Sequence, residues 1–279
     1  MAQAHTESAP AFVVGVGASA GGLEALESFF REAPLDSKMA FVVVQHLSTD
    51  FKSVMSDLLG RHTALPIHLV EDGMPVEADH VYLIPPKKEM IIAEGRLLLS
   101  ERDRQQELSL PIDVFLRSLA QDQGPRAVAV ILSGSGSDGS RGVRHVHDAG
   151  GLVIVQDVAS AQFDGMPRSA IDSGVADHIL APSQMAGALA RHAAVQHKLR
   201  QAEPRRDAPT GIGAVYQMLL DEFGLDFTHY KPSTVTRRIE RRLALAESQD
   251  SEEYGKRLNR DRDELDSFYR DLLIGVTRF

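Results

Sequence analysis

Phe12-Val-Val-Gly-Val-Gly-Ala-Ser-Ala-Gly-Gly22 combines an apolar run, a glycine-rich turn and the first residue of an amphipathic stretch. The run Phe12–Val16 is almost continuously apolar, which is typical of a strand that is covered on both faces. Residues 22–31 then repeat apolar side chains at helical spacing, so they predict a helix. A buried strand that leads directly into a helix indicates the first unit of an α/β fold.

The same alternation continues along the chain. Further apolar, Val- and Ile-rich runs occupy Ala40–Gln45, Ala127–Leu132 and Leu152–Gln156. Helical patterns occupy residues 51–61 and 111–121. Strands that alternate with helices favour right-handed crossovers, so we predict an α/β fold, doubly wound, with a mostly parallel sheet.

One region interrupts this pattern. Residues His80–Pro85, Met90–Ala93 and Arg96–Ser100 are predicted to be short antiparallel strands, with Glu94-Gly95 as a turn. The sequence therefore predicts a small antiparallel hairpin beside the parallel sheet.

Composition divides the chain into four expected parts. Residues 1–11 are expected to be a disordered tail, 12–194 the α/β domain, 195–209 a polar linker, and 210–279 a small all-α domain. The chain stops at Val276-Thr-Arg-Phe279 without a polar tail, so we expect it to be a fragment of a longer protein.

Composition also excludes several functions. With 30 Lys+Arg against 39 Asp+Glu, the net charge of −9 argues against nucleic acid as the main partner. The absence of cysteine excludes disulfides, thiolate metal sites and cysteine nucleophiles, and no histidine pattern predicts a metal site. No apolar run approaches the ~20 residues of a membrane span, and no secretory signal is visible. We therefore expect a cytoplasmic protein without membrane insertion.

The turn after the first strand is compatible with two chemistries. Gly17-Ala-Ser-Ala-Gly21 fits a nucleophile elbow, in which a tight strand-to-helix turn exposes the hydroxyl of Ser19. A dinucleotide site fits less well, because the glycine spacing is one residue too long and the second strand ends in Gln45-His46 without an acidic residue. A plain turn with Ser19 as a helix N-cap is the remaining interpretation.

Two further reactive residues follow predicted strands. His46 comes directly after Ala40–Gln45, and Asp138 follows Ala127–Leu132 and the loop Ser133-Gly-Ser-Gly-Ser137. Taken separately, His46 could lie in an ordinary loop and Asp138 could be an N-cap. Because ligands bind at the carboxyl edge of parallel sheets, we predict a shared site with Ser19 as nucleophile, His46 as base and acid, and Asp138 as the orienting carboxylate.

The motifs that carry this prediction resemble those of the CheB family, the chemotaxis-receptor methylesterases. The matching stretches are Gly15-Val-Gly-Ala-Ser-Ala-Gly-Gly22, Val44-Gln-His46, Leu132-Ser-Gly-Ser-Gly-Ser-Asp-Gly139 and Gly165-Met-Pro-Arg-Ser-Ala-Ile171. The resemblance implies hydrolysis of γ-glutamyl methyl esters on the cytoplasmic helices of receptors, with release of methanol and no cofactor. Deamidation of receptor glutamines is a second activity that some members have.

The resemblance also implies details of the site and its control. The oxyanion hole would use the backbone N–H at Ser135. Family members often have Thr after the nucleophile, where this chain has Ala20, so a catalytically weak scaffold or binding module in a chemotaxis-like complex is the alternative function. Few residues precede the first strand, so we expect no phosphoacceptor domain in cis and no effect of phosphodonors.

The C-terminal part resembles the helical N-terminal domain of CheR, the receptor methyltransferase. The similarity lies in Phe223-Gly-Leu-Asp-Phe-Thr-His-Tyr230 and in Pro232-Ser-Thr-Val-Thr-Arg-Arg-Ile-Glu-Arg-Arg242. It implies that a basic patch docks the receptor, formed by Arg237, Arg238, Arg241 and Arg242. The other interpretation is an exposed face paired with nearby acids. Thr277 would correspond to one contact of S-adenosylmethionine (SAM), a cofactor that we expect only in a full-length methyltransferase.

Overall fold

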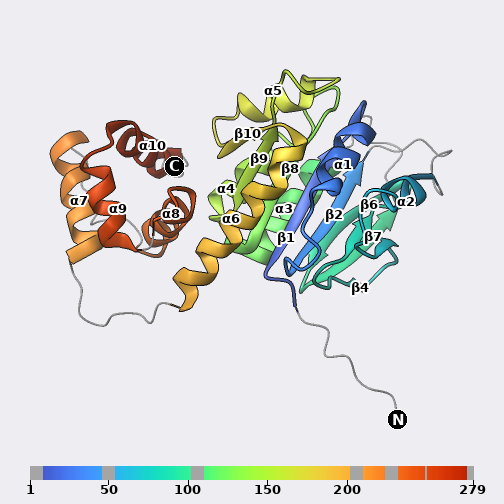
Figure 1. Ribbon diagram of the computed structural model, residues 1–279, viewed down its shortest axis with the longest axis horizontal. Helices are drawn as coiled ribbons and strands as arrows, with labels where there is room; N and C mark the ends of the chain where they lie inside the picture. The colour runs from blue at the N-terminus through green and yellow to red at the C-terminus, as the bar shows by residue number, and fades with distance from the viewer. Residues whose placement is uncertain are drawn as a thin grey trace, which may run out of the picture. The chain divides into compact units, whose positions relative to one another are not determined.

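The computed structural model describes residues 9–45, 54–101, 110–201, 210–223, 232–248 and 250–274. The chain divides into two compact units, Met1–Ala190 and Arg191–Phe279 (Figure 1).

The first unit is built on a parallel sheet of seven strands in the order β10-β9-β8-β1-β2-β5-β3. The strands are β1 (Phe12–Ala18), β2 (Met39–Gln45), β3 (Ile67–Leu69), β5 (Val81–Leu83), β8 (Ala127–Ile131), β9 (Leu152–Gln156) and β10 (His178–Leu180). Every neighbouring pair is parallel. The predicted doubly wound α/β fold is therefore confirmed, and β1 lies at its centre between β8 and β2.

Helices cover both faces of this sheet (Figure 1). They are α1 (Gly22–Arg31), α2 (Val54–Leu59), α3 (Pro111–Gln123), α4 (Gly142–Asp148), α5 (Gly165–Ile171) and α6 (Pro182–Gln201), with a short 3₁₀ turn, η2 (Gly124–Arg126).

The pleat of the sheet assigns α1 and α3 to opposite faces. Phe29 and Phe30 of α1 lie edge-on to Phe41 of β2, with ring centroids 5.9 and 5.7 Å apart. Gly15 of β1 pairs with Val42, the next residue of β2, and a Cβ at Gly15 would lie 2.9–3.0 Å from side chains of α3. Because successive residues of a strand point to opposite faces, α1 and α3 enclose the sheet between them.

A second, antiparallel sheet has the order β4-β7-β6, formed by β4 (Met74–Pro75), β6 (Lys88–Ala93) and β7 (Arg96–Glu101). The expected turn at Glu94-Gly95 is present, with φ of 52° and 69°, as a tight hairpin turn requires. The prediction for His80–Pro85 is wrong, because Val81–Leu83 forms β5, a parallel strand between β2 and β3. A run of three buried apolar residues is compatible with a parallel or an antiparallel strand. Only its long-range pairing shows which of the two sheets it joins.

The second unit contains four helices after the end of α6: α7 (Thr210–Phe223), α8 (Pro232–Leu245), α9 (Ser251–Leu258) and α10 (Arg262–Ile274). Apolar side chains from all four form one core, which includes Val215, Ile239, Tyr254 and Phe268. Asp250 caps α9 by accepting the backbone N–H groups of Glu252 and Glu253 at 2.9 and 2.8 Å. The small all-α part thus follows the α/β part, as the sequence predicts.

The boundary between the parts differs from the expected linker at 195–209. Helix α6 continues to Gln201, and residues 202–209 lie outside the described residues. The segment 195–201 contains no glycine or proline, and the first proline after it is Pro204, so nothing in its sequence ends the helix earlier.

Among the described helices, none is long and apolar enough to cross a membrane.

Candidate active site

Ser19 lies in the tight turn between β1 and α1. Its backbone N–H donates to the carbonyl of Ser133 at 3.0 Å, and its carbonyl accepts from the N–H of Gly22 at 2.9 Å. The N-cap of α1 is Gly21, whose φ of 65° favours glycine, so Ser19 does not cap that helix. The half-buried Ser19 therefore occupies a strand-to-helix turn that is fixed on both sides.

Ser133, which follows β8, connects three of the loops at this edge of the sheet. Its buried hydroxyl donates to the carbonyl of Ala20 at 2.9 Å and accepts from the N–H of Phe163 at 3.0 Å. Its backbone N–H donates to the side chain of Gln156, the last residue of β9, at 2.8 Å. The turns after β1, β8 and β9 are thereby tied together.

The glycine-rich loop after Ser133 approaches Ser19 closely. A Cβ placed on Gly134 would lie 3.0 Å from the Cβ of Ser19 and would overlap the thioether of Met166 at the start of α5. The carbonyl of Gly134 accepts from the N–H of Met166 at 2.8 Å. Only a glycine fits between the serine turn and α5, which explains the residue type at position 134.

Asp138 lies in the same loop and is buried, with 3% of its surface exposed. Its two carboxylate oxygens accept the backbone N–H groups of Ile112 and Asp113, at 3.0 and 2.9 Å. These are N–H groups of the first turn of α3, where no intrahelical acceptor exists and a negative charge is favoured. Asp138 therefore caps the first turn of α3 from outside that helix. It is not the N-cap residue of the helix that follows it, which was one interpretation of the sequence.

Asp113 caps the helix that follows Asp138, α4. Its Oδ1 accepts the backbone N–H groups of Arg141 and Gly142, at 3.0 and 2.6 Å, at the start of α4. The two aspartates thus cap each other's neighbouring helices, and this pair of caps fixes the loop from Ser133 to Arg141. This role of Asp113 was not predicted from the sequence, and the roles of Ser133 and Gln156 were not predicted either, although a glutamine that ends an otherwise apolar strand is a visible signal.

The remaining predicted site residues are Ser135, His46 and Thr277, and the structure describes the first of them. Ser135 is exposed, and within the described parts of the chain it makes no hydrogen bond, so its backbone N–H has no protein partner there. His46 and Thr277 lie outside the described residues. The last described residue before His46 is Gln45, which pairs with Ala18, the residue before Ser19.

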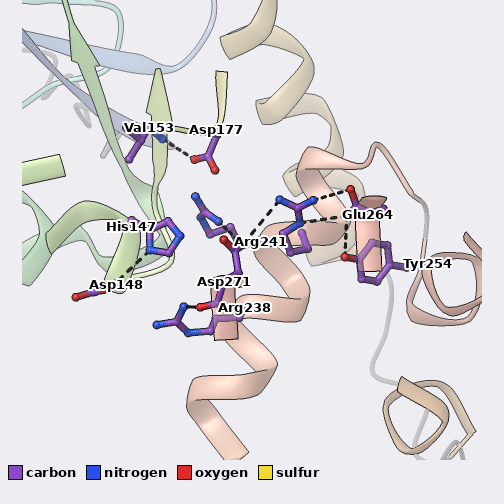
Figure 2. Close-up of polar contacts among 10 residues, drawn as sticks. His147, Asp148, Val153, Asp177, Arg238, Arg241, Tyr254, Glu264 and Asp271 are labelled. Atoms are coloured by element: carbon purple, nitrogen blue, oxygen red, sulfur yellow. Dashed lines mark hydrogen bonds and ion pairs between the residues drawn. The ribbon is translucent and has the colours of Figure 1, made fainter. Parts of the chain in front are cut away.

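The expected docking patch of four arginines requires a correction. Arg241 is 2% exposed, and its guanidinium donates to the Asp271 carboxylate of α10 at 2.7 Å (Figure 2). Arg238 is also buried and donates to the backbone carbonyl of Asp271. Arg242 makes two hydrogen bonds with Glu264, at 3.1 and 2.5 Å.

These three arginines hold α8 against α10 and are not an exposed basic face. The side chain of Arg237 is outside the described residues. The periodic apolar residues of α8 indicated one buried stripe. The acids of α10 that bind these arginines could not be predicted from the sequence of α8 alone.

Tyr254 completes this buried cluster. Its hydroxyl donates to Glu264 at 2.9 Å (Figure 2). Burial, together with the negative charge of Glu264, raises the pKa of Tyr254 well above its usual value. Burial by itself would lower the pKa of Arg242, but its hydrogen bond to Glu264 and the charge of that carboxylate outweigh burial and raise it. Both groups therefore keep their protons throughout the ordinary pH range.

We expect Glu264→Gln to destabilise the helical unit by about 3 kcal/mol, because the change leaves the Arg242 charge without its compensating carboxylate in a mostly buried position. The control is Glu252→Gln, which removes an exposed pair with Lys256 and should change stability little, because solvent screens that pair. Hydrogen exchange of the amides of α8 and α10 in the full chain measures both. Equal effects of the two variants would contradict the structural role assigned to Glu264.

The described residues contain no group of three or more His, Asp or Glu side chains arranged to hold a metal ion. What they contain is a doubly wound α/β domain with a serine turn and a buried aspartate after neighbouring strands, an arrangement of the kind that hydrolases use. A four-helix unit follows it in the chain.

Comparison with known proteins gives the family. Residues 14–189 match the family model described as CheB methylesterase, and the chain belongs to that family. Residues 212–273 match a second model, described as CheR methyltransferase, all-alpha domain. The two matches together span both compact units.

Individual relatives agree with this assignment. A protein of Rhodobacter capsulatus described as an uncharacterized 104.1 kDa protein is 42% identical over 81% of this chain and 26% of its own length. A protein-glutamate methylesterase/protein-glutamine glutaminase of Xanthomonas campestris is 36% identical over 60% of this chain and 48% of its own length. The chain thus spans at most about half of these relatives.

A solved structure matches the first unit. The CheB methylesterase catalytic domain of Thermotoga maritima aligns with a TM-score of 0.59 and 28% identity, over 64% of this chain and 97% of that domain. The fold predicted from the sequence is the fold of this family.

Proposed function

We propose that the α/β unit is a serine hydrolase that removes the methyl group from γ-glutamyl methyl esters on the cytoplasmic helices of receptor proteins. One observation carries the proposal: in a chain of the CheB methylesterase family, Ser19 and the buried Asp138 follow neighbouring parallel strands, β1 and β8. Strand β2, which precedes His46, is the other neighbour of β1, and its register supports the inclusion of this residue.

In the proposed reaction, the Ser19 oxygen attacks the ester carbonyl while His46 takes the hydroxyl proton. The carbonyl oxygen becomes an oxyanion, which the backbone N–H of Ser135 would stabilise. Collapse of this intermediate expels methoxide, which receives the proton from His46 and leaves as methanol. Water then attacks the acyl-serine while His46 takes its proton. This second step restores Ser19 and releases the glutamate. Asp138 orients His46 and stabilises its charged form.

Relatives that are also named protein-glutamine glutaminase support a second substrate class for the same site. Attack on a glutamine amide would follow the same steps, with ammonia leaving in place of methanol. We propose that neither reaction uses a cofactor, because serine, histidine and a backbone N–H supply the nucleophile, base and anion stabilisation. SAM would belong to a full-length methyltransferase.

The direct test is methanol release from a methylated receptor signalling fragment incubated with the chain. We expect turnover that is unaffected by EDTA. Receptor binding without methanol release would favour the alternative of a catalytically weak scaffold, for which Ala20 is the motivating residue.

A further inference from the structure

A cavity of about 240 Å³ lies beside the proposed site. Helices α3 and α4, which form most of its wall, lie against each other (Figure 1). The lining residues are Glu89, Leu110, Asp113, Val114, Arg117, Arg141 and His145. Those from α3 and its N-cap follow an i, i+3, i+4, i+7 pattern and therefore form one face of the helix.

The rim of this cavity is basic. Arg117 and Arg141 are exposed, and Arg144 is an exposed neighbour of His145 on α4. Within the described parts of the chain, the side chains of Arg117, Arg141, Arg144 and His145 have no hydrogen-bond or ion-pair partner. We call these four residues the α3/α4 basic rim. They stand out in a chain whose net charge is −9.

Two acids, Asp113 and Glu89, also line the cavity. Asp113 uses Oδ1 to cap α4, and its Oδ2 is buried with no hydrogen-bond partner among the residues that the structure describes. Glu89 is the other acid, half-buried on β6. The exposed groups of the rim are thus mainly positive.

The cavity is connected to the proposed site through α3. The backbone N–H of Asp113 donates to Asp138, and Arg141 follows Asp138 by three residues in the same capped loop. The wall of the cavity and the carboxylate of Asp138 are therefore held by the same contacts.

We propose that the α3/α4 basic rim binds carboxylate side chains of an acidic segment that flanks the reacting glutamate in the protein substrate. This inference rests on the proposed methylesterase function. Arginine presents a fork of donors that matches a carboxylate, and a local positive surface steers an acidic partner toward a protein that would otherwise repel it. The rim would thus select acidic substrate segments and add affinity close to the ester.

The experiment uses two synthetic helical peptides with one γ-methyl glutamate, flanked by glutamates in the first peptide and by glutamines in the second. We expect the KM of the wild-type chain to be about 10-fold lower for the acidic peptide, with kcat within about twofold, because the rim acts on binding and not on the reacting bond. Raising the NaCl concentration should remove most of this preference.

Arg117→Gln/Arg141→Gln should abolish the preference while the melting temperature stays unchanged. The matched control is Arg61→Gln/Arg126→Gln. Arg61 follows α2, and Arg126 precedes β8 at the opposite edge of the sheet, so this pair should keep the preference. If the test variant does not fold, Arg144→Gln alone should still weaken the preference.

Equal KM values for the two peptides would overturn the inference while leaving methylesterase activity established. If the wild-type chain hydrolyses neither peptide, the proposed function fails instead. Fluorescence anisotropy with Ser19→Ala would then still test the rim: tighter binding of the acidic peptide would support it, and equal binding would overturn it.

Discussion

Replacing Ser19 with Ala is expected to lower kcat/KM for methyl ester hydrolysis by about 10⁴-fold or more, because no other group can form the acyl intermediate. The fold should survive, since the turn is held by backbone hydrogen bonds from Ser19 to Ser133 and from Gly22 to Ser19, which do not involve the hydroxyl. Methanol release from a methylated receptor fragment measures the loss, and the melting temperature measures the fold.

Ser100→Ala is the matched control, because Ser100 is an exposed serine on β7 in the antiparallel sheet. It should leave kcat/KM unchanged. A fluorophosphonate reagent gives a second readout without any substrate: it should add its mass to the peptide that contains Ser19, and Ser19→Ala should prevent labelling. Methanol release by Ser19→Ala at the wild-type rate would refute the proposed nucleophile.

Asp138→Asn is expected to lower kcat by about 10³- to 10⁴-fold, because an amide can no longer stabilise a charged His46 or fix its tautomer. It should also lower stability by about 1 kcal/mol, since the amide nitrogen faces one of the two N–H groups of α3 that the carboxylate accepts. Kinetics and chemical denaturation of the same protein separate the two effects.

Asp79→Asn is the control for the structural part of this effect. The Oδ1 of Asp79 also accepts two backbone N–H groups, from Ser37 and Lys38, both at 2.9 Å. This contact lies just before β2 begins, at the opposite edge of the sheet from Ser19. Asp79→Asn should keep its kcat, and it should lose less stability than Asp138→Asn, because a single amide oxygen can still accept both N–H groups. If both variants lost activity in proportion to stability, Asp138 would be a structural cap alone.

The sequence predicted the central strands and the helices α1 and α3 closely, because their apolar runs and periodic faces are local signals. The expected strand Leu152–Gln156 has the same bounds as β9, and the expected helix Gly22–Arg31 those of α1. The short strands β3 and β10 were not predicted, since three residues carry too little pattern. Strand β5 was assigned to the wrong sheet for the same reason.

For the candidate site, the sequence identified Ser19, His46 and Asp138 by their positions after predicted strands, and their roles stay predictions. The contacts that hold the site could not be predicted, because they join residues far apart in the chain. Ser133 meets Phe163 of a later loop, and Asp138 caps a helix that begins 27 residues before it.

The sequence alone determined which segments are buried, the class of fold and the residue types available at the carboxyl ends of the strands, because hydrophobic periodicity and glycine-rich turns act over a few residues. Only the tertiary structure decided which helix Asp138 caps, that Arg241 and Arg242 serve the interior of the helical unit, and that Arg117, Arg141 and His145 line one cavity. Those outcomes depend on which distant groups satisfy a buried charge or an N–H group at a helix end. The partner is chosen by packing in three dimensions and leaves no pattern along the chain.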